Sequence, residues 1–222
     1  MGTKTGEPQI ESDIYAQVQQ RFADFDDPAH GWEHIHRVYQ LSLHIARLEN
    51  ADSFIAGIAA LLHDIGRLSH GSRQHHAELS KTLASELLSA YPITSEQKDA
   101  ILHAIMAHSY SRGVEPRTLE ARVVRDADRL DGLGAIGILR WAITGSIRRT
   151  SQTRLYHPDD PFAEQHQPDD RLFLLDHFFT KLLKLADTMS TETGRKMAQQ
   201  RTAFMRAYLE EFRKELRELD EK

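Results

Sequence analysis

Residues 58–67 read Ile-Ala-Ala-Leu-Leu-His-Asp-Ile-Gly-Arg, and this stretch decides the fold. The run from residue 53 to 65 is apolar on nearly all sides, which predicts a buried helix that ends at Gly66. His63 and Asp64 therefore lie at the carboxyl end of a buried helix. A carboxylate opposes the helix dipole there and is costly to bury unpaired, so we expect a bound cation beside it. The alternative is that Asp64 is a solvated residue at the helix end.

Helical spacing of apolar residues recurs in every long segment, and no segment alternates as a strand does. Thr94-Ser-Glu-Gln97 resembles a capping box that opens a helix. We interpret the glycine-rich segment 132–137 as close helix packing, because no strand precedes it as a dinucleotide-binding loop requires. Residues 150–170 are polar and rich in Pro and Asp, which predicts a loop that could act as a lid. Besides 53–65, helices are expected at about 11–23, 34–48, 76–90, 94–109, 118–130, 171–190 and 192–220.

Composition narrows the class of protein. The chain has 222 residues, enough for one large domain, and its helical pattern predicts an all-α, single-domain bundle. It has no cysteine, which excludes disulfides and thiolate zinc sites. The net charge of −5 argues against a nucleic-acid polymer as the main partner. No apolar stretch reaches the roughly 18 residues of a membrane helix, and the polar residues 1–10 read as a disordered leader, not a signal peptide. We expect a cytoplasmic protein.

Two more residues join His63 and Asp64 as candidate metal ligands. His34 opens the apolar face of its predicted helix, and Asp128 lies on the apolar stripe of another. His34 could instead be a core histidine, and Asp128 could pair with an arginine. Two imidazoles and two carboxylates without sulfur suit Mn²⁺, Fe²⁺, Co²⁺, Ni²⁺ or Zn²⁺ better than Ca²⁺. Such a set leaves positions for water and a phosphoryl oxygen.

These motifs carry a family resemblance. His34-Ile-His-Arg-Val38, His63-Asp-Ile-Gly-Arg67 and Asp126-Ala-Asp-Arg-Leu-Asp131 resemble, in order and separation, the motifs of the HD-domain metal-dependent phosphohydrolase superfamily. The resemblance covers nearly the whole chain from about residue 11, and it implies that His34, His63, Asp64 and Asp128 are the metal ligands. Further segments resemble small bacterial HD hydrolases, some of which are manganese-dependent nucleotide pyrophosphohydrolases: 27–34, 107–111, 130–137 and 191–198.

The sequence departs from that pattern at Gly31, where related sequences often have Asp. Glycine removes a carboxylate that could cap the helix or support the site. Asp27 or Glu33 could compensate for it.

Other residues near the motifs are candidates for catalysis or substrate binding. His76 and His108 match positions at which two-metal relatives place further ligands, but we expect a phosphate contact from His76 and a water-orienting role for His108. Without the resemblance, His76 would be a surface residue and His108 a packing residue.

Arg67 could bind a phosphate or cap its helix. Asp131 could orient the water or support a ligand imidazole, or it could pair with Arg129 or Arg140. Arg129 and Arg140 are further candidates for substrate binding. Asp64, His108 and Asp131 form the expected catalytic group.

The resemblance implies a hydrolase of phosphate esters or anhydrides in which residues 11–222 form the HD domain. A nucleoside triphosphate pyrophosphohydrolase is the first expectation. The alternatives are a phosphomonoesterase, a cyclic-nucleotide phosphodiesterase, or a non-catalytic nucleotide sensor. One divalent ion is expected, Mn²⁺ first, with Mg²⁺, Co²⁺, Ni²⁺, Fe²⁺ and Zn²⁺ open. The loop 150–170 and helices within 171–222 would pack on the core and shape the pocket. The partner is a phosphorylated small molecule, with no polymer or membrane expected and a homodimer left open.

Overall fold

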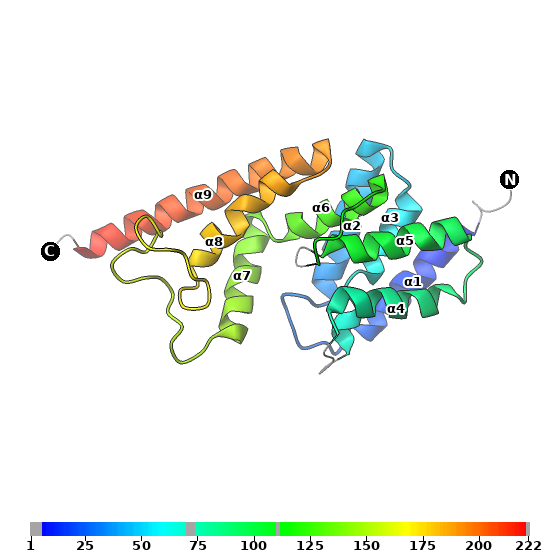
Figure 1. The fold of residues 1–222 in the computed structure, drawn as a ribbon, viewed down its shortest axis with the longest axis horizontal. Coiled ribbons are helices and arrows are strands. Elements are labelled where there is room, and N and C mark those ends of the chain that lie inside the picture. Colours follow the sequence, from blue (N-terminus) through cyan, green and yellow to red (C-terminus); the bar gives the residue numbers. More distant parts are fainter. Residues whose placement is uncertain (1–5, 70–73, 110–111, 221–222) are drawn as a thin grey trace. The chain divides into compact units, whose positions relative to one another are not determined.

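The computed structural model describes residues 6–69, 74–109 and 112–220, and within these ranges it contains helices and no strand (Figure 1). This confirms the all-α prediction. No helix in the described ranges is long and apolar enough to cross a membrane. The helices are α1 Glu7–Arg21, α2 Trp32–Glu49, α3 Ser53–Leu62, η1 Ile65–Leu68, α4 His76–Leu88, α5 Ser95–His108, α6 Leu119–Asp131, α7 Gly134–Arg148, α8 Asp176–Thr180, η3 Leu182–Thr188 and α9 Glu192–Asp220.

The chain forms two compact units. The first runs to Asp128 and also includes Ser190–Gly194. The second comprises Arg129–Met189 and the chain from Arg195 onward. Helices α6 and α9 each contribute residues to both units. All the candidate ligands belong to the first unit.

Helix α3 is the centre of the first unit and packs against α1, α2 and α5. Asp52 starts it by accepting hydrogen bonds from the backbone N–H groups of Phe54 and Ile55, at 2.9 and 3.1 Å. Its residues from Ala56 through Leu62 are buried, as the apolar run predicts. The buried helix thus carries the His63-Asp64 pair into the core, where both side chains are almost fully enclosed.

Gly66 has a different role from the predicted one. The helix ends at Leu62, and Gly66 lies inside the short helix η1 instead of in a left-handed cap. A Cβ atom on Gly66 would lie 2.4 Å from the carbonyl oxygen of His76 and 2.7 Å from the backbone nitrogen of Ser80. The glycine is required because α4 crosses η1 at backbone contact distance, which sets the start of α4 beside the His63-Asp64 turn.

Two helix boundaries differ from the sequence predictions near the amino terminus and after α7. Helix α1 begins at Glu7, so residues 7–10 are helical and not part of a leader, and residues 1–5 lie outside the described ranges. The prediction of one helix over 171–190 is wrong. Irregular chain continues to Leu175, and only the short α8 and η3 follow.

The capping box and the close approach at the glycine-rich segment can be compared with the structure. Thr94 and Gln97 form the capping box of α5. At the α6–α7 connection, a Cβ on Gly137 would lie 2.3 Å from the carbonyl oxygen of Gly132. The glycines therefore permit a close backbone approach, as predicted. This approach lies within the tight turn between α6 and α7, whereas the prediction placed it between two packed helices.

Candidate metal centre

Four side chains from three parts of the first unit converge on one point. His34 comes from the first turn of α2, His63 and Asp64 follow α3, and Asp128 comes from α6. The Nε2 atoms of His34 and His63 are 3.2 Å apart. His34 Nε2 lies 3.5 Å from Asp128 Oδ1 and 3.8 Å from Asp64 Oδ2. Ligand atoms bound to one ion at about 2.0–2.2 Å lie at such separations. His34, His63 and Asp128 form one group whose donor atoms are close enough together to hold a metal ion, and Asp64 Oδ2 lies beside it.

The tautomer of His63 is set by the backbone. Its Nδ1 lies 2.7 Å from the carbonyl oxygen of Ala60, which can only accept, so Nδ1–H donates there. The Nε2 lone pair of the neutral ring then faces His34 and the carboxylates. His108 is held in the same way, with Nδ1 2.5 Å from the carbonyl oxygen of Ile105. Both rings therefore turn Nε2 toward the centre, and in the neutral His63 ring this atom is unprotonated, as a metal ligand requires.

Electrostatics favour a neutral His63 and ionised carboxylates at Asp64 and Asp128. Burial lowers the pKa of His63. Burial alone would raise the pKa of Asp64, but Arg67 and the neighbouring imidazoles hold it well below its usual range. The pKa of Asp128 is also lowered, because His63 and His34 outweigh the burial of its carboxylate. Such a set of donors is suited to a divalent cation.

One carboxylate oxygen supports this fit. Asp64 Oδ1 is buried and has no hydrogen-bond partner among the described residues. The nearest imidazole nitrogens are His76 Nε2 at 3.6 Å and His108 Nε2 at 3.7 Å, beyond ordinary hydrogen-bond length. A buried, unpaired carboxylate oxygen is costly, and a bound cation would satisfy it.

Arg67 lies at the centre but is engaged by a carboxylate. Its Nε donates to Asp64 Oδ2, and its side chain is about one quarter exposed. The guanidinium neutralises Asp64 from one side and keeps part of its surface open. The structure thus places Arg67 beside the ligand set, and its phosphate contact stays a prediction.

His76 and His108 lie on the opposite side of Asp64 from this ion pair. His63, Asp64 and His108 form a second group whose donor atoms are close enough to hold a metal ion. Burial lowers the pKa of His76 to about 3, so this ring is neutral at physiological pH. Burial also opposes protonation of His108, but the Asp64 carboxylate raises its pKa. Both residues therefore lie at the centre. The phosphate contact of His76 and the water-orienting role of His108 remain predictions.

Asp131, Arg129 and Arg140 belong to the second unit. Asp131 is fully buried, and Arg140 Nη1 lies 3.1 Å from its Oδ2. Arg129 donates to the carbonyl oxygen of Thr188 at 2.6 Å. The alternative ion pair between Asp131 and Arg140 is therefore confirmed. Roles for the three residues in catalysis or substrate binding remain predictions.

The motifs in the sequence did not single out one pair of residues that lies close to the candidate ligands. Asp27 Oδ2 is 2.8 Å from His30 Nδ1, and the His30 ring lies 5.9 Å from the His34 ring between centroids. Asp27 thus orients His30. Helix α2 begins after Gly31 without a side-chain cap, so neither Asp27 nor Glu33 caps it. The spacing Asp-x-x-His before the first ligand was the available signal.

An all-α fold that gathers buried imidazoles and carboxylates in this order defines a metal-dependent phosphohydrolase of the HD type. The HD domain family model matches residues 31–133, a range that includes all four candidate ligands. The chain belongs to the HD superfamily, and a single HD fold covers it.

Similar proteins extend the match to nearly full length. The chain is 32% identical to the uncharacterised protein YpgQ of Bacillus subtilis, over 93% of this chain and 94% of that protein. The crystal structure of B. subtilis YpgQ in complex with ADP matches with a TM-score of 0.74 and covers 94% of this chain and 96% of that one, at 32% identity. An HD-superfamily hydrolase from Bacillus thuringiensis is 30% identical with a TM-score of 0.74, over 95% of this chain and 98% of the other.

Proposed function

We propose that this protein hydrolyses nucleoside triphosphates to nucleoside monophosphate and pyrophosphate. One water molecule is consumed, the bond between the α- and β-phosphoryl groups breaks, and the new oxygen stays on one phosphorus. One divalent ion would be held by His34, His63, Asp64 and Asp128. The observation that carries the metal assignment is the convergence on His34 Nε2 of His63 Nε2 at 3.2 Å, Asp128 Oδ1 at 3.5 Å and Asp64 Oδ2 at 3.8 Å.

The bound ion would supply two kinds of chemistry, polarisation of a phosphoryl oxygen and a lowered pKa for water. Mn²⁺ is the first candidate, because imidazole with hard carboxylate ligands and no sulfur suits it. Mg²⁺, Co²⁺, Ni²⁺, Fe²⁺ and Zn²⁺ are tested beside it. The nucleotide assignment draws on the ADP complex of YpgQ and on the resemblance to small bacterial pyrophosphohydrolases.

The chain's own groups have separate tasks in this proposal. Arg67 is fixed by Asp64 and still partly exposed, so its free N–H groups bind a non-bridging phosphate oxygen. His108 presents Nε2 to the centre and accepts or returns a proton of the attacking water. His76, neutral at physiological pH, donates or accepts a hydrogen bond at the substrate phosphate. Arg129, Arg140 and Asp131 belong to the second unit, where Asp131 is ion-paired with Arg140, and they are given no task at the metal centre in this proposal.

A phosphomonoesterase or phosphodiesterase with two metal ions is the second candidate. The observation that favours it is the second donor group, His63, Asp64 and His108, with His76 Nε2 3.6 Å from Asp64 Oδ1. In this arrangement Asp64 would bridge two ions. Metal stoichiometry separates the candidates, since the pyrophosphohydrolase proposal needs one equivalent.

The test is a screen of nucleoside mono-, di- and triphosphates and of 2′,3′- and 3′,5′-cyclic nucleotides with each metal, with products identified by mass. Release of pyrophosphate from a triphosphate is the expected result. Release of inorganic phosphate or opening of a cyclic nucleotide would favour the second candidate. Absence of turnover with every metal, in protein that binds nucleotide, would identify a non-catalytic sensor and overturn the proposal.

A further inference from the structure

Asp126 is a fully buried carboxylate on α6, two residues before the candidate ligand Asp128. It accepts hydrogen bonds from residues that follow it by more than sixty positions. The Ser190 N–H is 3.0 Å from each of its two oxygens, and the Thr191 N–H and Oγ1–H lie 2.7 and 2.8 Å from Oδ2. Both carboxylate oxygens are therefore occupied by donors from Ser190–Gly194, which we call the clamp segment.

The clamp segment is shaped around this carboxylate. Thr191 precedes the first residue of α9, and its Oγ1 accepts from the Gly194 N–H at 2.9 Å, as a helix N-cap does. A Cβ atom on Gly194 would lie 2.5 Å from Asp126 Oδ2 and 2.7 Å from Thr191 Oγ1. Only glycine at this position lets the first turn of α9 approach Asp126 so closely.

Two more contacts tie the clamp segment to the helices that carry ligands. The Thr193 N–H donates to Glu49 Oε1 at 2.6 Å, at the carboxyl end of α2. Arg125 of α6 donates to the Ser190 hydroxyl. The segment therefore contacts both α2 and α6, and its bonds to Asp126 are the ones that reach the turn of α6 that carries Asp128. All these residues lie in the first unit.

We propose that Asp126 is a positioning residue for the metal site, and that its bonds to the clamp segment fix the turn of α6 from which Asp128 reaches His34 and His63. The proposal rests on the proposed function, because it takes Asp128 as a ligand. The other three ligands come from α2 and the end of α3, which pack on each other. Asp128 is supplied by α6 alone, so its placement depends on what holds that helix. A metal site tolerates errors of only about 0.5 Å, so a loosened α6 weakens the ion's coordination.

Asp126→Asn is the sharpest probe, because it preserves the shape of the side chain. The new amide has one accepting oxygen, and its NH₂ group must face an N–H donor of Ser190 or Thr191. Gly194→Ala disturbs the same contact from the other side and leaves α6 unchanged. Thr191→Val removes only the hydroxyl and is the mildest of the three. Glu49→Ala is the matched control, since it removes a bond to the same segment without touching Asp126.

The readout is the Mn²⁺ dissociation constant, measured by electron paramagnetic resonance of free Mn²⁺ at a temperature where circular dichroism shows each variant folded. We expect Asp126→Asn to weaken Mn²⁺ binding by about 10-fold to 100-fold, the usual effect of losing a partner that supports a ligand. Gly194→Ala and Thr191→Val should weaken it less, and Glu49→Ala should bind as the wild type does. If Asp126→Asn does not fold, the other two variants decide.

A second readout separates positioning from ligation. Excess Mn²⁺ should restore the activity of Asp126→Asn, because its four ligands are intact, whereas Asp128→Ala should not recover. Equal Mn²⁺ affinity in wild type, Asp126→Asn, Gly194→Ala and Thr191→Val would overturn the inference, as would an equal loss in Glu49→Ala. Failure of the wild type to bind Mn²⁺ in a manner that depends on Asp64 would instead overturn the proposed function.

Discussion

The protein has two clusters of histidine and aspartate that use the same residue types in opposite ways. In the metal centre, the Nε2 atoms of His34 and His63 face each other at 3.2 Å. In the second unit, His166 lies between two carboxylates, with Nδ1 2.8 Å from Asp160 Oδ2 and Nε2 2.9 Å from Asp176 Oδ2. A carboxylate at each ring nitrogen favours the imidazolium form of His166, in which both nitrogens carry a proton and donate a hydrogen bond.

Burial and hydrogen bonding explain the contrast. Hydrogen bonds to Asp176 and Asp160 raise the pKa of His166, whereas burial lowers the pKa of His63. Asp176 Oδ1 is also buried without a hydrogen-bond partner among the described residues. An unpaired carboxylate oxygen therefore does not define a metal site by itself. What distinguishes the metal centre is that several unprotonated donor atoms converge on one point.

The largest expected effect is the loss of function in Asp64→Ala. This change removes a ligand and its negative charge, so we expect tight Mn²⁺ binding to disappear and hydrolysis to fall to background. Asp176→Ala is the matched change in the other cluster, and it should keep both. Mn²⁺ titration and turnover measurements on the two variants test this expectation. Loss of metal binding in Asp176→Ala, or its retention in Asp64→Ala, would contradict the assignment of the metal to the Asp64 cluster.

Arg67→Ala comes next in size. It removes a charge-assisted hydrogen bond, and we expect kcat/KM to fall by roughly 10-fold to 100-fold. A rise in KM alone would indicate a contact made equally to substrate and transition state, and a fall in kcat a contact made in the transition state. Arg47, an exposed arginine of the last turn of α2, provides the control substitution Arg47→Ala. An unchanged kcat/KM would leave Arg67 with only its structural bond to Asp64.

The sequence could indicate the candidate ligands because they follow the helical pattern. His34 lies on an apolar helix face, and His63 and Asp64 end an apolar run, so their burial is encoded locally. The partners of Asp126 could not be found in this way. Ser190 and Thr191 are remote in the chain, and they bind Asp126 largely through backbone N–H groups, which every residue except proline has and which therefore leave no sequence signal.

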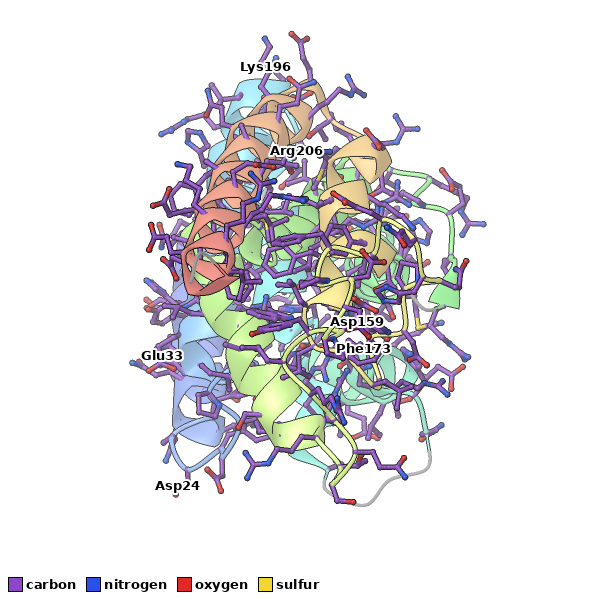
Figure 2. All side chains as sticks on the ribbon, turned by 90° about the vertical axis from the view of Figure 1, so that its left-hand side faces the viewer. Asp24, Glu33, Asp159, Phe173, Lys196 and Arg206 are labelled. Carbon is purple, nitrogen blue, oxygen red and sulfur yellow. The ribbon has the colours of Figure 1, made fainter. Side chains whose placement is uncertain are left out.

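The irregular segment after α7 is held together by hydrogen bonds from aspartate side chains to backbone N–H groups. Asp160 accepts from the backbone N–H groups of Glu164, Gln165 and His166, and Asp169 from that of Arg171. Side chains that bind backbone N–H groups compete with helical hydrogen bonds. Polar composition correctly indicated a loop, but it gave no sign of this ordered network. Asp159 and Phe173, which Figure 2 labels, belong to the same segment.

A moderate effect on stability is expected from His166→Ala. The substitution leaves the buried Asp176 without its cation and should lower Tm by about 5 °C at pH 6. His166 has a raised pKa in the folded protein, so its contribution is present below its unfolded pKa of about 6.5 and is lost as pH rises through the folded pKa. The difference in Tm between wild type and variant should therefore shrink at alkaline pH. Thermal unfolding from pH 6 to 9, with the exposed-residue variant His44→Ala as control, measures it. A difference independent of pH would contradict the imidazolium assignment.

The Mn²⁺ affinity of the candidate metal centre should rise with pH, whereas the stabilising contribution of His166 falls with pH. Mn²⁺ binding requires unprotonated imidazoles, so affinity should fall as pH drops below about 6.5. Because burial lowers the pKa of His63, the loss should be gradual and continue towards pH 5. Mn²⁺ titrations between pH 5 and 8 test this expectation. Affinity that stays constant over that range would argue against histidine ligands.

The most direct test of the metal assignment is a crystal structure of the protein with Mn²⁺, with anomalous data collected at the manganese edge. We predict one strong peak within about 2.0–2.3 Å of His34 Nε2, His63 Nε2 and oxygens of Asp64 and Asp128. No peak should appear beside His166, whose nitrogens already face carboxylates. A peak at the His166 cluster, with none between His34 and Asp128, would contradict the central claim.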